Sequence, residues 1–131
     1  MERKVINPWT WQDPLGFVQA NEISGGRRIL LCAGQVSLDA NGKLLHAGDM
    51  RGQINQVMDN LETVLKAAGF TLFDVVRMTM YTTQVDQFLA NRSDMMERLA
   101  RAGAKYASTL LGVARLARPE LLVEIEATAI Q

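Results

Sequence analysis

Apolar residues recur at helical spacing in the middle of the chain. They lie three and four positions apart on one face: Ile54, Val57, Met58, Leu61, Val64, Leu65 and Ala68. Asp49 precedes this run as a candidate N-cap residue, and Gly69 follows it as a candidate C′ residue. The pattern predicts a helix over residues 50–68. A shorter set of apolar positions predicts a second helix that ends near Gly103: Phe88, Met95, Met96 and Leu99.

Runs of β-branched and apolar residues on either side of these helices predict strands. They cover residues 17–23, 28–37, 75–83, 108–116 and 121–130. Asn41-Gly42 is a typical hairpin turn, and it would join residues 36–40 to a further strand at 43–47. The order β-β-β-α-β-α-β-β fits an α+β sandwich in which two helices cover one face of a mixed sheet.

The face of this sheet that the helices leave uncovered carries polar groups in the predicted arrangement. Because side chains alternate along a strand, one of two triplets is uncovered on each strand. For residues 75–83 the triplets are Arg77, Thr79 and Tyr81, or Val76, Met78 and Met80. For residues 121–130 they are Glu124, Glu126 and Thr128, or Val123, Ile125 and Ala127. A mixed face of this kind favours an oligomer interface or a cleft wall over plain solvent exposure.

Length and charge narrow the class of protein. With 131 residues, the chain is expected to form a single domain over residues 1–131. Lys and Arg together number 14, as do Asp and Glu, so the formal net charge is zero, which disfavours nucleic acid as a partner. No stretch approaches the ~20 apolar residues that a membrane span needs, and no signal-peptide pattern follows Met1. We therefore expect a cytoplasmic protein without a membrane partner.

Metal and cofactor motifs are not found in the sequence. The single histidine, His46, has no Cys or His partner at ligand spacing, and no nucleotide-binding glycine motif occurs. We predict neither a metal site nor a cofactor. The single cysteine, Cys32, lies in the apolar run 29–33, which favours a buried small hydrophobe over a nucleophile.

Glu124 and Glu126 are the residues with the clearest catalytic potential. They are two positions apart, so they share one face of a strand, and apolar residues flank them. A carboxylate in such surroundings can serve as a general acid or base. The alternative is a pair of exposed acids that form ion pairs with Arg77 or Arg115.

Several short segments follow one another between residues 14 and 130. They are Gly16-Phe17-Val18-Gln19-Ala20, Ala33-Gly34-Gln35-Val36, the stretch from Gln53 to Gly69, Val75-Val76-Arg77-Met78-Thr79, Asp86-Gln87-Phe88 with Asn91, Val113-Ala114-Arg115-Leu116 and Val123-Glu124-Ile125-Glu126-Ala127. In this order they resemble the reactive-intermediate deaminase (YjgF/Rid) family. The resemblance implies a chorismate-mutase-like, ferredoxin-like sandwich and a homotrimer with a small-molecule cleft between neighbouring subunits. It also implies cofactor-free hydrolysis of reactive 2-imino or 2-enamino acids to 2-keto acids and ammonia.

The resemblance assigns roles to individual residues. The family's water-activating glutamate corresponds to Glu124, and the glycine that holds the reacting end corresponds to Gly34. Four further positions correspond to substrate-binding residues: Phe17, Asn91, Ser108 and Leu110. The gap from Phe88 to Asn91 is one residue shorter than usual, and the loop around residues 117–119 is one residue longer.

Ser108 is the main departure from the family, because it stands where relatives carry the arginine that binds the substrate carboxylate. A neutral hydroxyl lacks the charged fork of a guanidinium, so we expect a loss of roughly 1.5–3 kcal/mol in binding such a substrate. Three alternative functions follow, given in order of preference. The chain is a hydrolase of an imine, enamine or related molecule without a carboxylate, a trimer that binds a small ligand without turnover, or an RNA-directed protein of endoribonuclease type.

Overall fold

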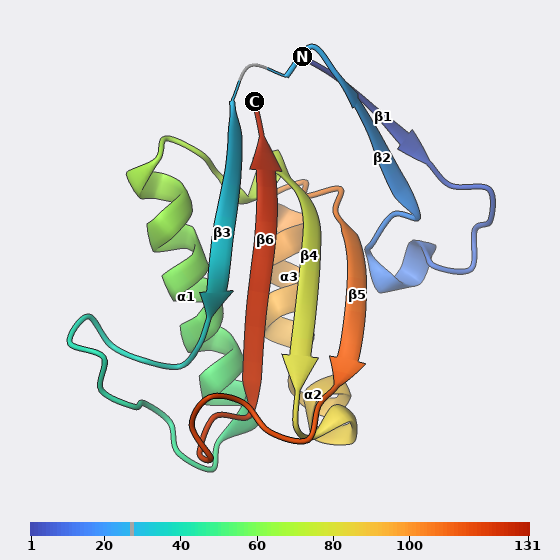
Figure 1. The fold of residues 1–131 in the computed structure, drawn as a ribbon. Helices are drawn as coiled ribbons and strands as arrows, with labels where there is room; N and C mark the ends of the chain where they lie inside the picture. The colour runs from blue at the N-terminus through green and yellow to red at the C-terminus, as the bar shows by residue number, and fades with distance from the viewer. Residues whose placement is uncertain (27) are drawn as a thin grey trace.

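The computed structural model describes residues 1–26 and 28–131. Its centre is a four-stranded sheet in the order β3-β6-β4-β5 (Figure 1). The strands are β3 (Ile29–Gln35), β4 (Val75–Thr82), β5 (Ala107–Gly112) and β6 (Val123–Ile130). β4 and β5 are parallel, whereas β6 runs antiparallel to both β3 and β4. The sheet is therefore mixed, as predicted.

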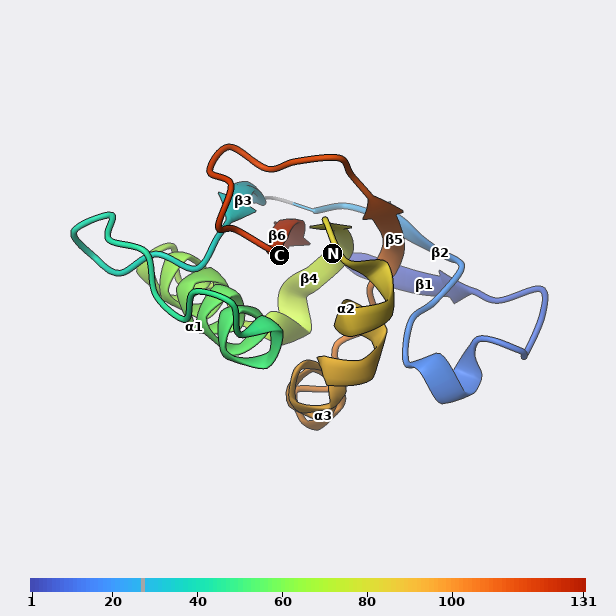
Figure 2. The same cartoon turned by 90° about the horizontal axis from the view of Figure 1, so that it is seen from below.

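Helices cover one face of this sheet, as the view from below shows (Figure 2). They are α1 (Met50–Ala67), α2 (Val85–Asn91) and α3 (Ser93–Arg101), accompanied by the short 3-10 helices η1 (Asp13–Leu15) and η2 (Leu72–Asp74). In the described part of the chain, no helix lies on the other face of the sheet, which we call the open face. None of the described helices is long and apolar enough to cross a membrane.

The first predicted helix is confirmed almost to the residue. α1 spans Met50–Ala67, and the Asp49 carboxylate accepts a hydrogen bond from the backbone N–H of Gly52 at 2.9 Å. Gly69 takes the left-handed conformation expected of a C′ residue, with φ of 78°. The second predicted helix is instead divided into α2 and α3, because Arg92 leaves the helical conformation (φ −90°, ψ 1°).

One strand prediction is wrong, and one strand at the N-terminus was not predicted. Residues 43–47 form no strand, and only a bridge between Leu38 and Leu44 pairs the two sides of the predicted hairpin. The sequence also failed to indicate β1 (Glu2–Ile6), which pairs with β2 (Ala20–Ser24) in a separate hairpin. β1 buries none of its five residues, so it lacks the alternation by which a strand is identified. The observed order is β-β-β-α-β-α-α-β-β.

β6 separates the core from the open face. Its residues alternate strictly between buried and half-buried, and the buried set comprises Val123, Ile125, Ala127 and Ala129. Glu124, Glu126 and Thr128 consequently lie on the open face, where they pair with Tyr81, Thr79 and Arg77 of β4. The polar triplets are therefore the uncovered ones, and Met78 and Met80 point into the core.

The side chain of Gln53 connects α1 to the start of β6. It is completely buried, and its amide nitrogen donates to the carbonyls of His46 (3.2 Å) and Glu120 (3.0 Å). Its oxygen accepts a hydrogen bond from the backbone N–H of Leu122 at 2.8 Å. All three bonds are to backbone groups: the Glu120 carbonyl and the Leu122 N–H have no other partner among the described residues, whereas the His46 carbonyl also accepts from the Asp49 N–H at 3.1 Å. Gln53 thus determines where the chain enters β6, two residues before Glu124.

Replacing Gln53 by leucine should strongly destabilise the fold. The substitution roughly conserves volume but removes three hydrogen bonds and leaves the Glu120 carbonyl and the Leu122 N–H without their partner, so we expect a loss of about 2–4 kcal/mol in the free energy of unfolding. Urea unfolding followed by circular dichroism measures this loss. The matched control is Gln56→Leu on the same helix, where the amide bonds only to Asn60 at 2.9 Å and the expected loss is under about 1 kcal/mol. Equal losses in both variants would contradict this role for Gln53.

Candidate active site

Two carboxylates and a tyrosine stand together on the open face. The Tyr81 hydroxyl donates a hydrogen bond of 2.7 Å to Oε1 of Glu126. This bond raises the pKa of Tyr81 above its usual value, and burial and the negative charges of Glu126 and Glu124 add to the effect. Glu126 is therefore engaged by Tyr81. Among residues 1–26 and 28–131, no hydrogen bond to the Glu124 carboxylate is found, so Glu124 can act on another molecule.

Gly34 provides the space in which the Glu124 side chain lies. The register of β3 against β6 shifts between Cys32 and Gln35, and Gly34 falls within that shift. A Cβ atom at Gly34 would collide with the Glu124 carboxylate oxygen and approach its Cδ to 2.7 Å and its Cγ to 2.9 Å. The glycine is required here for space, because its φ angle is not in the left-handed region. Gly34 and Glu124, which we call the open-face pair, are in direct contact.

A cavity of about 360 Å³ opens beside Glu124. Its lining consists of Tyr81, Val113, Arg115, Leu116, Ala117, Glu124 and Glu126. Arg115 supplies the only positive charge in this lining, and its Nε donates to the Leu116 carbonyl at 3.3 Å. The predicted alternative, in which Glu124 or Glu126 forms an ion pair with Arg77 or Arg115, is not found within the described residues. The cavity is the size of a small metabolite.

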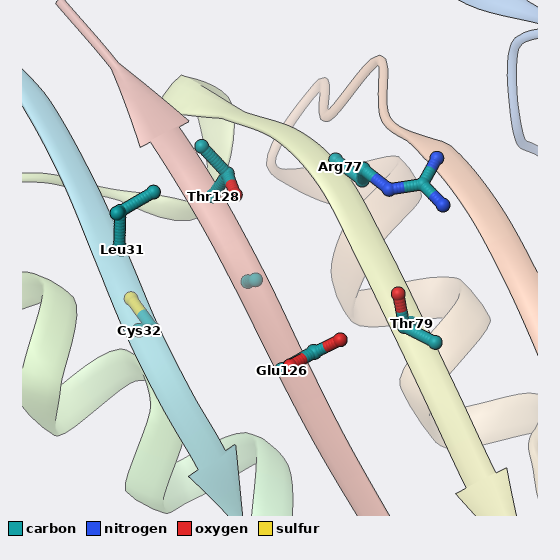
Figure 3. A pocket seen from close by; sticks show the side chains of 7 residues that line it. Leu31, Cys32, Arg77, Thr79, Glu126 and Thr128 are labelled. Atoms are coloured by element: carbon teal, nitrogen blue, oxygen red, sulfur yellow. The ribbon is translucent and has the colours of Figure 1, made fainter.

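A second cavity of about 190 Å³ lies farther along the open face (Figure 3). Its lining comprises Leu31, Cys32, Arg77, Thr79, Glu126, Ala127 and Thr128. Arg77 points away from Glu126 toward β5, where its Nη2 donates to the Thr109 hydroxyl at 3.4 Å. Cys32 is buried, as predicted, and burial raises the pKa of its thiol. The thiol form is therefore favoured, and Cys32 is a poor nucleophile.

The remaining predicted site residues do not share the open face with Glu124. Ser108 and Leu110 pair with Met78 and Met80, so their side chains point to the helix-covered side of the sheet. Phe17 packs against the hydrophobic core, as does Leu110. The segment that carries Phe17 runs beside β5, because the next backbone N–H, that of Val18, donates to the Tyr106 carbonyl at 3.0 Å.

Asn91 ends α2, and its side-chain amide donates to the Gln87 carbonyl of the same helix at 2.8 Å. α2 packs at the end of β5, since a Cβ atom at Gly112 would meet Val85 at 2.9 Å. We refer to Phe17, Ser108 and Leu110 as the edge group. Within one chain, Gly34 and Glu124 are in contact, whereas Ser108 and Leu110 of the edge group lie on the other side of the sheet.

Sequence reasoning named neither Tyr81 nor Arg115 as a catalytic or substrate-binding residue. The alternation of Tyr81 with Arg77 and Thr79 was the available signal, because it placed Tyr81 on the same candidate face as Glu124. Arg115 belongs to the Val113-Ala114-Arg115-Leu116 segment, but it lies in the irregular stretch between β5 and β6, where strand alternation does not say which way a side chain points. His46 is exposed before α1, and no cluster of three or more potential metal ligands occurs in the described residues.

Comparison with known proteins supports the predicted family. A family model described as endoribonuclease L-PSP matches residues 15–131. This chain belongs to the YjgF/RutC/Rid family. The solved structure of YyfB from Yersinia pestis, a Rid family protein of unknown function, is 41% identical, with a TM-score of 0.89 over 100% of both chains. Protein DfrA of Myxococcus xanthus is 33% identical over 99% of this chain and 97% of its own length. A RutC family protein of Pyrococcus horikoshii is 33% identical over 76% of this chain and 77% of its own.

The contact between Gly34 and Glu124 can be measured as a coupling energy. Gly34→Ala should force the Glu124 side chain out of its rotamer and lower the free energy of unfolding by about 1 kcal/mol. The loss should largely disappear in a Glu124→Ala background, which gives a coupling of about 0.5–1.5 kcal/mol in a double-mutant cycle of urea unfolding. The control cycle pairs Gly34→Ala with Glu126→Ala and should show almost no coupling. Similar coupling in both cycles would refute the specific contact.

Proposed function

We propose that this Rid family protein is a cofactor-independent hydrolytic deaminase of a reactive imine, enamine or related small molecule that lacks a carboxylate. The observation that supports the proposal most directly is the position of Glu124. Its carboxylate contacts Gly34, borders a cavity of about 360 Å³ and has no hydrogen-bond partner among the described residues. A carboxylate in this setting can bind and activate a water molecule.

The chemistry requires only water and one group that transfers protons. Glu124 accepts a proton from water as the water oxygen attacks the carbon of the protonated imine, which gives a neutral carbinolamine. Glu124 returns this proton to the nitrogen, the C–N bond breaks and ammonia leaves, while Glu124 takes up the proton of the carbinolamine hydroxyl and releases it to solvent. A carbonyl forms at the same carbon, so the atoms balance without an oxidant or a metal. Tyr81 assists indirectly, because its hydrogen bond keeps the Glu126 carboxylate occupied and away from the reacting water.

The complete site is proposed to lie between subunits of a homotrimer. Glu124 points to the open face, whereas Ser108 and Leu110 point to the helix-covered side of the same sheet, so one chain cannot present both sides to a single ligand. The open face also exposes Ile29 (65%) and Leu31 (77%), apolar side chains that association of copies would cover. A neighbouring subunit could place its edge group opposite the Glu124 cavity of this one.

The substrate is proposed to lack a carboxylate because the edge group has no charge. Ser108 is half-buried and neutral, and Phe17 and Leu110 are apolar. Arg115 borders the Glu124 cavity, but it shares that cavity with two glutamates whose negative charges oppose the binding of another anion. The arrangement therefore favours a neutral or cationic imine.

Ammonia release from imines formed in situ tests the proposal. An amine oxidase acting on benzylamine supplies a carboxylate-free imine, and an amino-acid oxidase supplies 2-imino acids. The wild-type protein should accelerate ammonia release from the first, and Glu124→Gln should lower the rate about 10²-fold or more. Glu126→Gln is the matched control and should retain activity within about ten-fold. An active Glu124→Gln variant would contradict the mechanism. If ligands stabilise the protein thermally but no imine is hydrolysed, it is the non-catalytic binding trimer instead.

Restoring the family arginine should shift the substrate preference. Ser108→Arg supplies a guanidinium that pairs with a carboxylate, so kcat/KM for 2-imino acids should rise about ten- to a hundred-fold. Thr109→Arg is the control, because residue 109 pairs with Thr79 and faces the other side of the sheet. It should bring no gain. Wild-type activity on 2-imino acids that equals its activity on carboxylate-free imines would refute the proposed substrate class.

A further inference from the structure

An exposed tryptophan adjoins the edge group. Trp11 is 60% exposed. Its ring meets the ring of Phe17 edge-on, with the ring centroids 6.0 Å apart and an interplanar angle of 72°. This is the favourable T-shaped geometry of aromatic pairs. Trp11 thus extends the apolar surface of Phe17 outward from the edge of β5.

The backbone around Trp11 is fixed even though its indole lies in solvent. The neighbouring Gln12 is completely buried, and its amide nitrogen donates to the Asp13 carboxylate at 3.1 Å. Its amide oxygen accepts a hydrogen bond from Gln19 at 3.1 Å. Backbone bonds from Asp13 to the Thr10 carbonyl (3.0 Å) and from Leu15 to the Gln12 carbonyl (2.8 Å) close the turn of η1. The loop therefore holds Trp11 in a defined position beside Phe17.

We propose that Trp11 determines substrate specificity, because it forms with Phe17 an aromatic wall that selects a flat aromatic imine. The inference rests on the proposed function, which assigns Phe17 to the ligand cleft. Two aromatic rings meeting at an angle can each contact a third ring, by stacking or edge-on. One such contact contributes about a three- to ten-fold preference for an aromatic over a saturated ring of similar size. The uncharged Ser108 and the apolar Leu110 agree with a ligand of this kind.

Binding of two unreactive amides tests the inference separately from turnover. Benzamide and cyclohexanecarboxamide have similar size and no carboxylate, and they differ in the aromatic ring. We expect wild-type protein to bind benzamide about three- to ten-fold more tightly by calorimetry, and Trp11→Ala to abolish this preference. Trp9→Ala is the matched control, since Trp9 is the only other tryptophan and is similarly exposed (57%). It should leave the preference unchanged.

Fluorescence gives an independent measurement. In a Trp9→Phe variant, Trp11 is the only tryptophan, and benzamide should change its emission at the concentrations that saturate binding. The inference is overturned if Trp11→Ala and Trp9→Ala behave alike, or if Trp11 emission responds to dilution of the oligomer but not to benzamide. An aromatic preference that depends on Trp11, without ammonia release, would retain the inference and refute the proposed function. If wild type and Trp11→Ala both release ammonia, and each does so at equal rates from aromatic and saturated imines, the proposed function is retained and the inference about Trp11 is refuted.

Discussion

The three hydrogen bonds of the buried Gln53 side chain are the constraint on which the other features of the sheet depend. They hold α1, the segment before α1 and the segment before β6 in one arrangement, so β6 enters the sheet in a single register. A slip of one residue would turn Glu124 and Glu126 into the core and bring Val123 and Ile125 to the open face. The chemistry of the open face is therefore determined by a residue that lies on the opposite side of the sheet.

The close approach of Gly34 to Glu124 converts that register into a candidate site. Glu126 is held by Tyr81, whereas Glu124 lies over a glycine and beside a small cavity. Two carboxylates on one strand thus have different surroundings, and this difference supports separate roles for them. Ser108 and Leu110 of the edge group point to the helix-covered side of the sheet instead. The edge group is uncharged, and Trp11 enlarges its apolar surface through Phe17. Both features support the proposal of a ligand without a carboxylate.

The sequence predicted those parts of the fold in which burial leaves a periodic signal. α1 was predicted almost to the residue because seven of its 18 positions are buried, most of them at helical spacing, and both of its ends carry capping residues. β1 was not predicted because nothing in it is buried, and the break at Arg92 was not predicted because the apolar spacing continues from α2 into α3. Family resemblance identified Gly34 and Glu124 but not their contact, which depends on the register shift in β3. It could not separate the open-face pair from the edge group either, because that separation depends on the pairing of β5 with β4.

The most direct test of a site shared between subunits is complementation by two inactive variants. Glu124→Gln removes the carboxylate that we propose activates water, and Ser108→Trp places a bulky side chain in the edge group of an otherwise intact chain. The two are mixed, dissociated and reassembled, and native mass spectrometry confirms mixed oligomers. If each site takes Glu124 from one subunit and the edge group from its neighbour, ammonia release should return to about a quarter of the wild-type rate. Mixed oligomers that remain as inactive as the separate variants would show that the site does not lie between copies of the chain.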